Sequence, residues 1–175
     1  MKKTAILLIA IAALCTLPTN AQKRGDRFFG GNLRFALSSS GSNGYMSTGT
    51  FFGIAPEFGY LVADRVKIGG KIGYEVSSNA HAVTLTPNIA YYLPIIDRLY
   101  YTPQLNIGGG AGVYSGYVAG IFTLDMELVS FEYRPTERTG ISTSLASLNY
   151  NLIDRTNSFN FSILYSPSIA FHYYF

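Results

Sequence analysis

Two histidines are the first residues in this sequence whose type suggests acid–base or nucleophilic chemistry. His81 follows Ser77, Ser78 and Asn79 in a polar stretch, and His172 stands near the C-terminus. Acyl transfer needs a base beside a nucleophile, and an acid usually orients that base. No acidic residue accompanies His81, and no serine stands two positions after His172. We therefore predict no catalytic residues and do not expect an enzyme.

Seven charged residues form a second set that could take part in chemistry. Each lies in a stretch where polar and apolar residues alternate, so in extended strands these charges share the face opposite the apolar one. A buried charge without a partner is costly, so four acids and three bases on an enclosed face predict a neutralising ion network. A selective path for ions or protons is the alternative. The seven residues are Arg34, Glu57, Lys67, Lys71, Glu75, Asp125 and Glu127.

Other short motifs have plainer interpretations. The glycine-rich stretch 108–112 is not followed by Lys-Ser or Lys-Thr, and no helical pattern begins there, so it is not a phosphate loop. The tripeptide Arg24-Gly25-Asp26 matches an adhesion motif, but it falls in an expected N-terminal tail. Nothing resembles a metal cluster or a nucleic-acid surface. We expect no cofactor, no metal and no nucleic-acid partner.

The composition indicates which elements position these residues. Of 175 residues, 48% are hydrophobic, 15% are aromatic and only 13% are charged, about half the charged share of a soluble domain. The only apolar run that approaches a membrane helix is residues 5–17, which is too short for a stable span. Abundant Gly (18), Tyr (14) and Phe (12) favour strands. A bundle of membrane helices is therefore not expected.

The first 21 residues are predicted to be a secretory signal peptide. Lys2 and Lys3 precede an apolar run at 5–14, and cleavage is expected after Ala21. Removal takes two of the thirteen cations, which leaves 11 against 10 acids and a net charge of +1. The only cysteine, Cys15, is removed as well. The mature chain then has neither a disulfide nor a thiolate metal site.

Alternation with period two predicts strands through the rest of the chain. It is clearest at 159–175, where every odd position is apolar or aromatic or is Pro167, and it becomes irregular within 117–150. Short turns are expected at 64–65, 97–98 and 134–137. Polar loops are expected between them, at 38–50, 77–82, 115–116 and 151–158. At about eleven residues each, eight strands fit comfortably. Ten strands are the alternative if 117–150 divides differently.

The class of barrel depends on whether the aromatic face of the strands points outward or into the barrel. Because an eight-stranded barrel barely holds its own inner side chains, a continuous aromatic face does not fit inside it. The opposite face is rich in small residues, which suit a narrow lumen. The sequence thus predicts an all-β, eight-stranded antiparallel up-and-down transmembrane β-barrel over 28–175. A cleavable signal helix and a periplasmic tail at 22–27 precede it. A soluble lipocalin-like barrel is the alternative.

Several motifs carry a family resemblance across 28–175. They are Phe29-Gly30-Gly31-Asn32-Leu33, Pro56-Glu57-Phe58-Gly59-Tyr60 with Asp64-Arg65, Gly69-Gly70-Lys71-Ile72-Gly73-Tyr74, and Phe171-His172-Tyr173-Tyr174-Phe175. The chain resembles the small outer-membrane β-barrel domain family of OmpA/OmpX-like type found in Bacteroidota. The resemblance implies an integral protein of the outer membrane of a Gram-negative bacterium.

The family is functionally mixed, so the resemblance implies a location and not a mechanism. Our interpretation is a structural or surface-interaction role through external loops, with a plugged lumen and with outer-membrane lipid and an unidentified external ligand as partners. A monomer is expected. A small channel is the first alternative, and a rim-type lipid-modifying enzyme, with His and Ser beside an acid, is the second. The last strand resembles the signal read by the outer-membrane assembly machinery. The residues of that expected signal are Ile169, Phe171, Tyr173 and Phe175.

Overall fold

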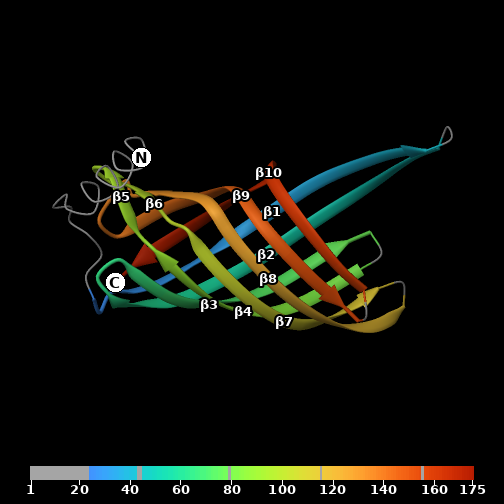
Figure 1. Cartoon of the computed structure of the whole chain (residues 1–175), viewed down its shortest axis with the longest axis horizontal. Helices are drawn as coiled ribbons and strands as arrows, with labels where there is room; N and C mark the ends of the chain where they lie inside the picture. Colours follow the sequence, from blue (N-terminus) through green and yellow to red (C-terminus); the bar gives the residue numbers. More distant parts are fainter. Residues whose placement is uncertain (1–23, 43–44, 79, 115, 155) are drawn as a thin grey trace, which may run out of the picture.

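The structure is a computed structural model that describes residues 24–42, 45–78, 80–114, 116–154 and 156–175. The predicted signal peptide lies outside these residues. The described chain forms ten β-strands wound into one closed sheet (Figure 1). The strands are β1 (Arg27–Ser42), β2 (Tyr45–Ala63), β3 (Val66–Ser77), β4 (Ala80–Tyr91), β5 (Leu93–Ile96), β6 (Leu99–Tyr101), β7 (Gln104–Tyr114), β8 (Tyr117–Tyr133), β9 (Thr139–Ile153) and β10 (Thr156–Tyr174).

Hydrogen bonding closes these strands into an antiparallel ring of eight. The order is β8-β7-β4-β3-β2-β1-β10-β9, and β9 pairs again with β8. The two short strands β5 and β6 continue β4 and β7 towards one end and pair with each other. The predicted eight-stranded up-and-down antiparallel barrel is therefore confirmed. No helix in the described residues has the length and apolar character that a membrane crossing requires, a result that does not bear on strands.

Two interruptions turn eight wall strands into ten elements. One falls at Tyr92, between β4 and β5, and the other at Thr102 and Pro103, between β6 and β7. Proline has no N–H to donate to a neighbouring strand. The wall stays bonded because the Tyr92 N–H donates to the Arg65 carbonyl and the Thr102 N–H to the Ser130 carbonyl, each at 2.8 Å.

One end of the barrel, here called the terminal end, carries both Arg27 and Phe175. Their backbones exchange two hydrogen bonds, of 3.0 and 2.9 Å. The turns at 64–65, 97–98 and 134–138 lie at this end too, as predicted, and the first two contain Arg65 (φ 69°) and Arg98 (φ 64°). Positive φ is typical of tight hairpin turns.

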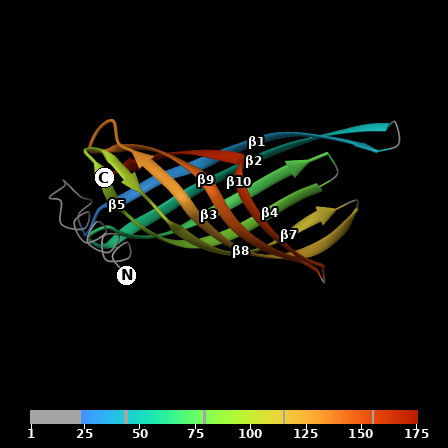
Figure 2. The same ribbon diagram turned by 45° about the horizontal axis from the view of Figure 1, so that its top comes forward.

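The opposite end, here called the hairpin end, differs from expectation. The predicted loop 115–116 is confirmed, because β7 pairs with β8 up to Tyr114 and Tyr117. The predicted lengths of the other polar loops are wrong: β1 pairs with β2 as far as Ser42 and Tyr45, and β9 pairs with β10 as far as Ile153 and Thr156. Likewise, β3 and β4 pair up to Ser77 and Ala80. A polar residue remains in a strand when a neighbouring strand satisfies its backbone, so polarity alone did not show where the strands end. The β1–β2 hairpin projects beyond the others (Figures 1 and 2).

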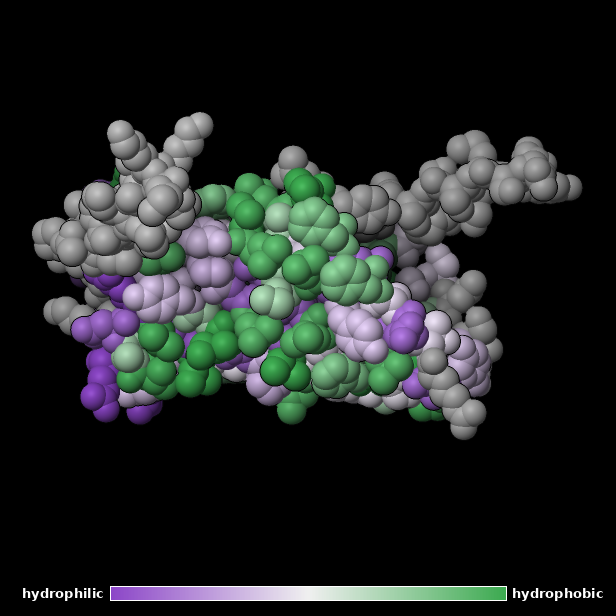
Figure 3. Space-filling view, in the orientation of Figure 1, coloured by the Kyte–Doolittle hydropathy of each residue, from purple (hydrophilic) through white to green (hydrophobic). Residues whose placement is uncertain are grey.

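Apolar side chains cover the outside of the ring. The outward residues include Leu85 (60% exposed), Phe58 (59%) and Ile72 (53%), whereas the neighbouring inward residues Glu57 and Lys67 are 2% exposed. Hydrophobic residues dominate the middle of the visible face, and hydrophilic ones gather at the terminal end (Figure 3). This arrangement is the reverse of a soluble barrel and matches the lipid-facing band of a membrane barrel.

A β-bulge in β8 changes which residues face inward. The pairing with β9 shifts between Glu127 and Ser130. Before the bulge, the odd residues Asp125 and Glu127 line the lumen. After it, the even residues Ser130 and Glu132 are buried. An extra residue in one strand reverses the alternation in this way.

Glycines on the inner face make room for large side chains. A Cβ at Gly59 would lie 2.1 Å from a ring carbon of Phe28, and one at Gly30 would lie 2.4 Å from a ring carbon of His172. Such distances exclude any side chain without displacement of the ring. The narrow lumen thus holds Phe28 and His172 because their cross-strand partners, Gly59 and Gly30, carry no Cβ.

Candidate functional site in the barrel lumen

The terminal half of the lumen contains a buried ion pair between Glu57 of β2 and Lys67 of β3. The Lys67 Nζ atom lies 2.9 Å from Glu57 Oε1, and both side chains are 2% exposed. The Asn88 amide of β4 donates a second hydrogen bond to the same oxygen at 3.0 Å. The Lys67 ammonium also lies 4.8 Å from the Phe28 ring centroid. Short distances and burial make this an ion pair that water screens little.

Glu132 of β8 is the acceptor at the centre of a second buried group. Its carboxylate accepts hydrogen bonds from Arg134 Nε at 2.7 Å, Tyr174 Oη at 2.7 Å and Tyr92 Oη at 3.3 Å. Arg134 stacks its guanidinium 3.7 Å from the Tyr174 ring centroid. Burial alone would lower the pKa of Arg134, which lies just beyond β8, but Tyr174 and Glu132 together raise it above the ordinary value. Because arginine stays protonated in proteins, Arg134 contributes a cation to this group.

His172 joins the two groups into one network. Its Nδ1 lies 3.1 Å from Glu132 Oε2, and its Nε2 lies 3.5 Å from Glu57 Oε2. Its ring also packs edge-on against Phe28, with 5.5 Å between the centroids. We call Glu57, Lys67, Glu132, Arg134 and His172 the terminal network. It fills the lumen near the terminal end with paired charges and aromatic rings.

A smaller polar cluster lies on the hairpin side of the terminal network. Lys71 Nζ is 3.6 Å from Glu127 Oε1 and donates to Asn106 Oδ1 at 3.3 Å. The Asn106 amide in turn donates to Asp125 at 3.3 Å and to Glu127 at 3.4 Å. A cavity of about 20 Å³ lies between this cluster and the terminal network, which is space for about one water molecule.

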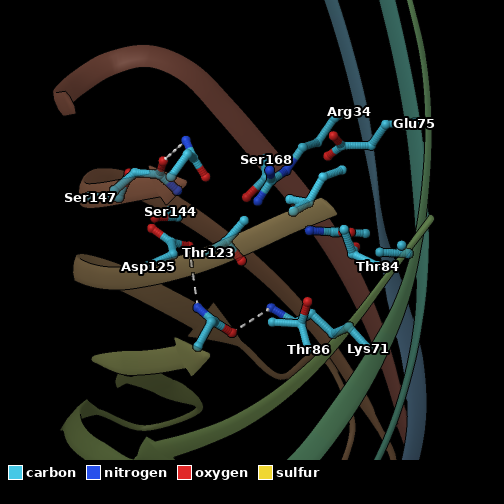
Figure 4. Close-up of a pocket in the computed structure, with 18 of the residues that line it drawn as sticks. Arg34, Lys71, Glu75, Thr84, Thr86, Thr123, Asp125, Ser144, Ser147 and Ser168 are labelled. Atoms are coloured by element: carbon cyan, nitrogen blue, oxygen red, sulfur yellow. Dashed lines mark hydrogen bonds between the residues drawn. The ribbon is translucent and has the colours of Figure 1, made fainter. Parts of the chain in front are cut away.

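The hairpin half of the lumen is hollow. A cavity of about 440 Å³ is lined by residues from all eight wall strands, most of them polar (Figure 4). Arg34 and Glu75 line it together with Asp125. Within the described part of the chain, no ion pair within 4.0 Å involves any of these three. The charged plug is therefore confined to the terminal half.

The structure thus divides the seven predicted lumen residues into three groups. It brings Glu57 together with Lys67, and Lys71 together with Glu127, while Arg34, Glu75 and Asp125 line the cavity. Sequence reasoning missed Glu132 and Arg134, and it did not place His172 in the network. The missed signal is the polar alternation at 130, 132 and 134, which becomes visible once a bulge reverses the phase.

The predicted assembly-signal residues lie on the outside of the barrel. Phe175 is 65% exposed, and its ring stacks on Tyr173 with 6.3 Å between the centroids. Ile169 and Phe171 are also exposed, and Tyr173 and Phe171 pair with Phe29 and Gly31 of β1. This apolar row flanks the join between the last strand and the first.

The other motifs singled out in the sequence, namely His81, the glycine-rich stretch and the tripeptide 24–26, take part in the structure of the barrel. The His81 ring is exposed, and its Nδ1 lies 3.4 Å from Tyr74 Oη, while Asn79 lies outside the described residues. The stretch 108–112 is part of β7. In the tripeptide 24–26, the Gly25 N–H donates to the Leu61 carbonyl at 3.0 Å and the Asp26 carbonyl accepts from Leu61. Over the described ranges, no three His, Cys, Asp or Glu side chains gather as a metal site would require.

Known proteins resemble this chain in fold but not in sequence. No family model matches it, and no curated protein does. Among solved structures, Neisserial surface protein A (NspA) matches with a TM-score of 0.52 at 12% identity, over 87% of this chain and 100% of that one. A de novo designed transmembrane β-barrel gives a TM-score of 0.43 at 11% identity, covering 89% of this chain and 99% of the design. The likeness to NspA shows that the chain has the fold of a small outer-membrane β-barrel.

Proposed function

We propose that the protein is an integral, monomeric protein of the outer membrane of a Gram-negative bacterium, exported by the segment 1–21. The observation that carries this proposal is the reversed polarity of the barrel: apolar residues outside, and a buried charged network inside. Only lipid around the barrel makes that distribution favourable. Membership of the OmpA/OmpX-like family is part of the proposal and rests on the sequence motifs.

The orientation follows from the two ends of the barrel. We place the terminal end, with Phe175, in the periplasm and the hairpin end outside, because the longer projections of such barrels lie on the external side. The β1–β2 hairpin reaches furthest from the body of the barrel (Figure 2). We propose this hairpin as the element that contacts an external ligand or surface. The range 38–50, predicted as a polar loop, belongs to this hairpin.

The proposed role is structural or surface-interacting, without transport. The terminal network closes the lumen because Glu57, Lys67 and His172 are all at most 6% exposed and contact one another or Glu132. The polar 440 Å³ cavity favours a small channel as the second candidate. The proposal includes no catalytic activity, since His81 contacts Tyr74 and both ring nitrogens of His172 face carboxylates.

Conductance in planar lipid bilayers tests the closed lumen. We expect folded, purified protein to insert without steady unit currents. The double variant Glu132→Ala with Arg134→Ala, which removes two of the five side chains of the terminal network, is expected to give intermittent currents if it remains folded. Steady unit currents from the unmodified protein would support the channel instead. A heat-dependent change in gel mobility, measured on the same samples, shows that each variant is folded.

A further inference from the structure

The cavity in the hairpin half of the lumen extends to the tips of the strands. On its terminal side it ends at the polar cluster of Lys71, Asn106 and Glu127. On its other side its lining includes Tyr114, the last residue of β7, and Phe51 of β2. These two aromatic residues share one cross-strand row, which passes through the ends of β4 and β3. The cavity therefore reaches the hairpin end, which the proposed orientation places outside the cell.

Hydroxyl and amide side chains make up about half of the lining. The volume of about 440 Å³ lies within the range of pockets that bind small molecules, roughly 300–1,000 Å³. Such pockets are usually lined by apolar residues, so this one suits a ligand that carries many polar groups. Hydroxyls and amides both donate and accept hydrogen bonds, as the hydroxyls of a sugar do. The lining hydroxyls include those of Thr84, Thr86, Thr123, Ser144, Ser147 and Ser168 (Figure 4).

The charged residues of the lining do not balance. They are Arg34, Lys71, Glu75, Asp125 and Glu127, so two cations stand against three carboxylates and one negative charge is in excess. The cations of the terminal network contact the two carboxylates of that network and do not line the cavity. A recess with walls of low dielectric constant concentrates ions of the opposite sign. The cavity therefore favours a ligand with one positive charge.

Arg34 and Glu75 lie side by side on one wall of the cavity. Gly53 of β2 is the cross-strand partner of Arg34 on β1 and of Glu75 on β3. Gly53 places no side chain between them, and a Cβ at that position would lie 3.5 Å from Glu75 Cγ. The guanidinium and the carboxylate thus project from the same wall with opposite charges (Figure 4). Together they contribute no net charge to the cavity.

Asp125 is the carboxylate that remains, since Lys71 lies 3.6 Å from Glu127. It stands on β8, four strands from β2 in either direction around the ring, so it faces β2 across the cavity (Figure 4). The Asn106 amide donates a hydrogen bond to Asp125 at 3.3 Å. A neutral amide orients the carboxylate without cancelling its charge. Asp125 is therefore the position at which the cavity offers a partner to a cation.

Phe51 and Tyr114 supply aromatic surface where the cavity reaches the hairpin end. The strands that carry them, β2 and β7, are separated in the ring by β3 and β4, so the two side chains stand on different sides of the cavity. An aromatic ring offers a flat apolar face, which the C–H side of a sugar ring can cover. Aromatic side chains together with hydroxyls favour a hydroxyl-bearing ring over a small linear amine.

We propose that the cavity is a binding site for a small amino sugar that enters from the hairpin end. The ammonium group of the sugar lies at Asp125, and its hydroxyls bond to the Ser, Thr and Asn side chains of the lining. The terminal network closes the lumen on the other side, so the sugar is bound and not transported. Entry from outside the cell rests on the proposed orientation, whereas binding to purified protein does not. Heat-dependent gel mobility of the same preparation tests the membrane barrel separately.

Calorimetric titration of folded protein tests the ligand class, in a polyoxyethylene detergent whose head group is not a sugar. The probes are glucosamine, N-acetylglucosamine and ethanolamine at neutral pH. The second probe keeps the hydroxyl-bearing ring without the charge, and the third keeps the charge without the ring. We expect glucosamine to bind at least tenfold more tightly than either. No binding of glucosamine, or equal affinity for glucosamine and one of the other probes, would overturn the proposal.

Carboxamide variants test the assignment of the ammonium group. Asp125→Asn removes the charge that binds it, so the affinity for glucosamine should fall about tenfold, because hydrogen bonds between charged groups are the stronger ones. The affinity for N-acetylglucosamine should not change. Glu75→Gln should cause a smaller loss, and Glu137→Gln, in an exposed turn at the terminal end, should cause none. Unchanged glucosamine affinity in Asp125→Asn, or an equal or larger loss in Glu75→Gln, would overturn the assignment to Asp125.

Discussion

His172 Nδ1 lies 3.1 Å from Glu132 Oε2, although 40 residues separate the two along the chain. This contact joins the last strand of the barrel to β8, and a second contact of the same ring reaches Glu57 on β2. One imidazole thus connects strands from different parts of the ring. Charge pairing inside the lumen, together with the backbone ladder, fixes how the strands are arranged near the terminal end.

Loss of Glu132 should cause the largest destabilisation in the lumen. Glu132→Ala leaves Arg134 buried without its 2.7 Å partner and removes the acceptor of Tyr174. Breaking one side of a buried pair costs about 3–5 kcal/mol. Urea unfolding in detergent micelles measures the change, with Glu137→Ala on the exposed turn as the control, expected to stay within about 0.5 kcal/mol. Equal stabilities would mean that the terminal network contributes nothing to folding.

The two lumen lysines should differ in their contribution. Lys67 lies 2.9 Å from Glu57 at 2% exposure, whereas Lys71 lies 3.6 Å from Glu127 at 13% exposure. Both Lys67→Met and Lys71→Met leave a carboxylate without its cation, at a cost of a few kcal/mol. We expect the Lys67 variant to lose more stability, because its carboxylate is the more buried. The reverse order in the same unfolding assay would contradict the assigned burial of the two pairs.

Two glycines offer a matched test of lumen packing. A Cβ at Gly59 would lie 2.1 Å from the Phe28 ring, while a Cβ at Gly70 would have nothing within 4 Å. Gly59→Ala should therefore cost about 1–3 kcal/mol by overpacking. Gly70→Ala should be neutral or stabilise by up to about 1 kcal/mol, since alanine restricts the unfolded chain. Similar effects of the two variants on the unfolding midpoint would argue against the close approach of Gly59 to Phe28.

The alternating pattern predicted much of this fold. It assigned Phe58, Ile72 and Leu85 to the outer face and Glu57 and Lys67 to the inner one, because period two in a strand separates the faces without knowledge of the neighbours. It failed at Glu132 and Arg134, since a bulge is a property of the pairing between two strands. The strands at the hairpin end were predicted too short for a related reason: strand length depends on the partner strand.

The apolar row of the last strand, Ile169, Phe171, Tyr173 and Phe175, is expected to direct assembly in the outer membrane. An extended strand with an apolar face can add to a sheet edge through its backbone while alternate side chains fill pockets. Deletion of Phe175, or Tyr173→Asp with Phe175→Asp, should leave the signal peptide cleaved but the protein degraded in the periplasm. Membrane fractionation and protease protection measure this outcome. Normal insertion with only lower thermal stability would make these aromatics simple lipid anchors.

Tryptophan fluorescence tests most directly whether the apolar face meets lipid, because the chain contains no tryptophan of its own. Leu85→Trp places a probe on the outer face, and Thr86→Trp places one in the lumen cavity next to it in sequence. In vesicles of brominated phospholipid, a membrane barrel predicts strong quenching at position 85 and weak quenching at position 86. A contradicting result would be no quenching at position 85, in folded protein that stays in solution and does not bind the vesicles. That result would favour a soluble barrel.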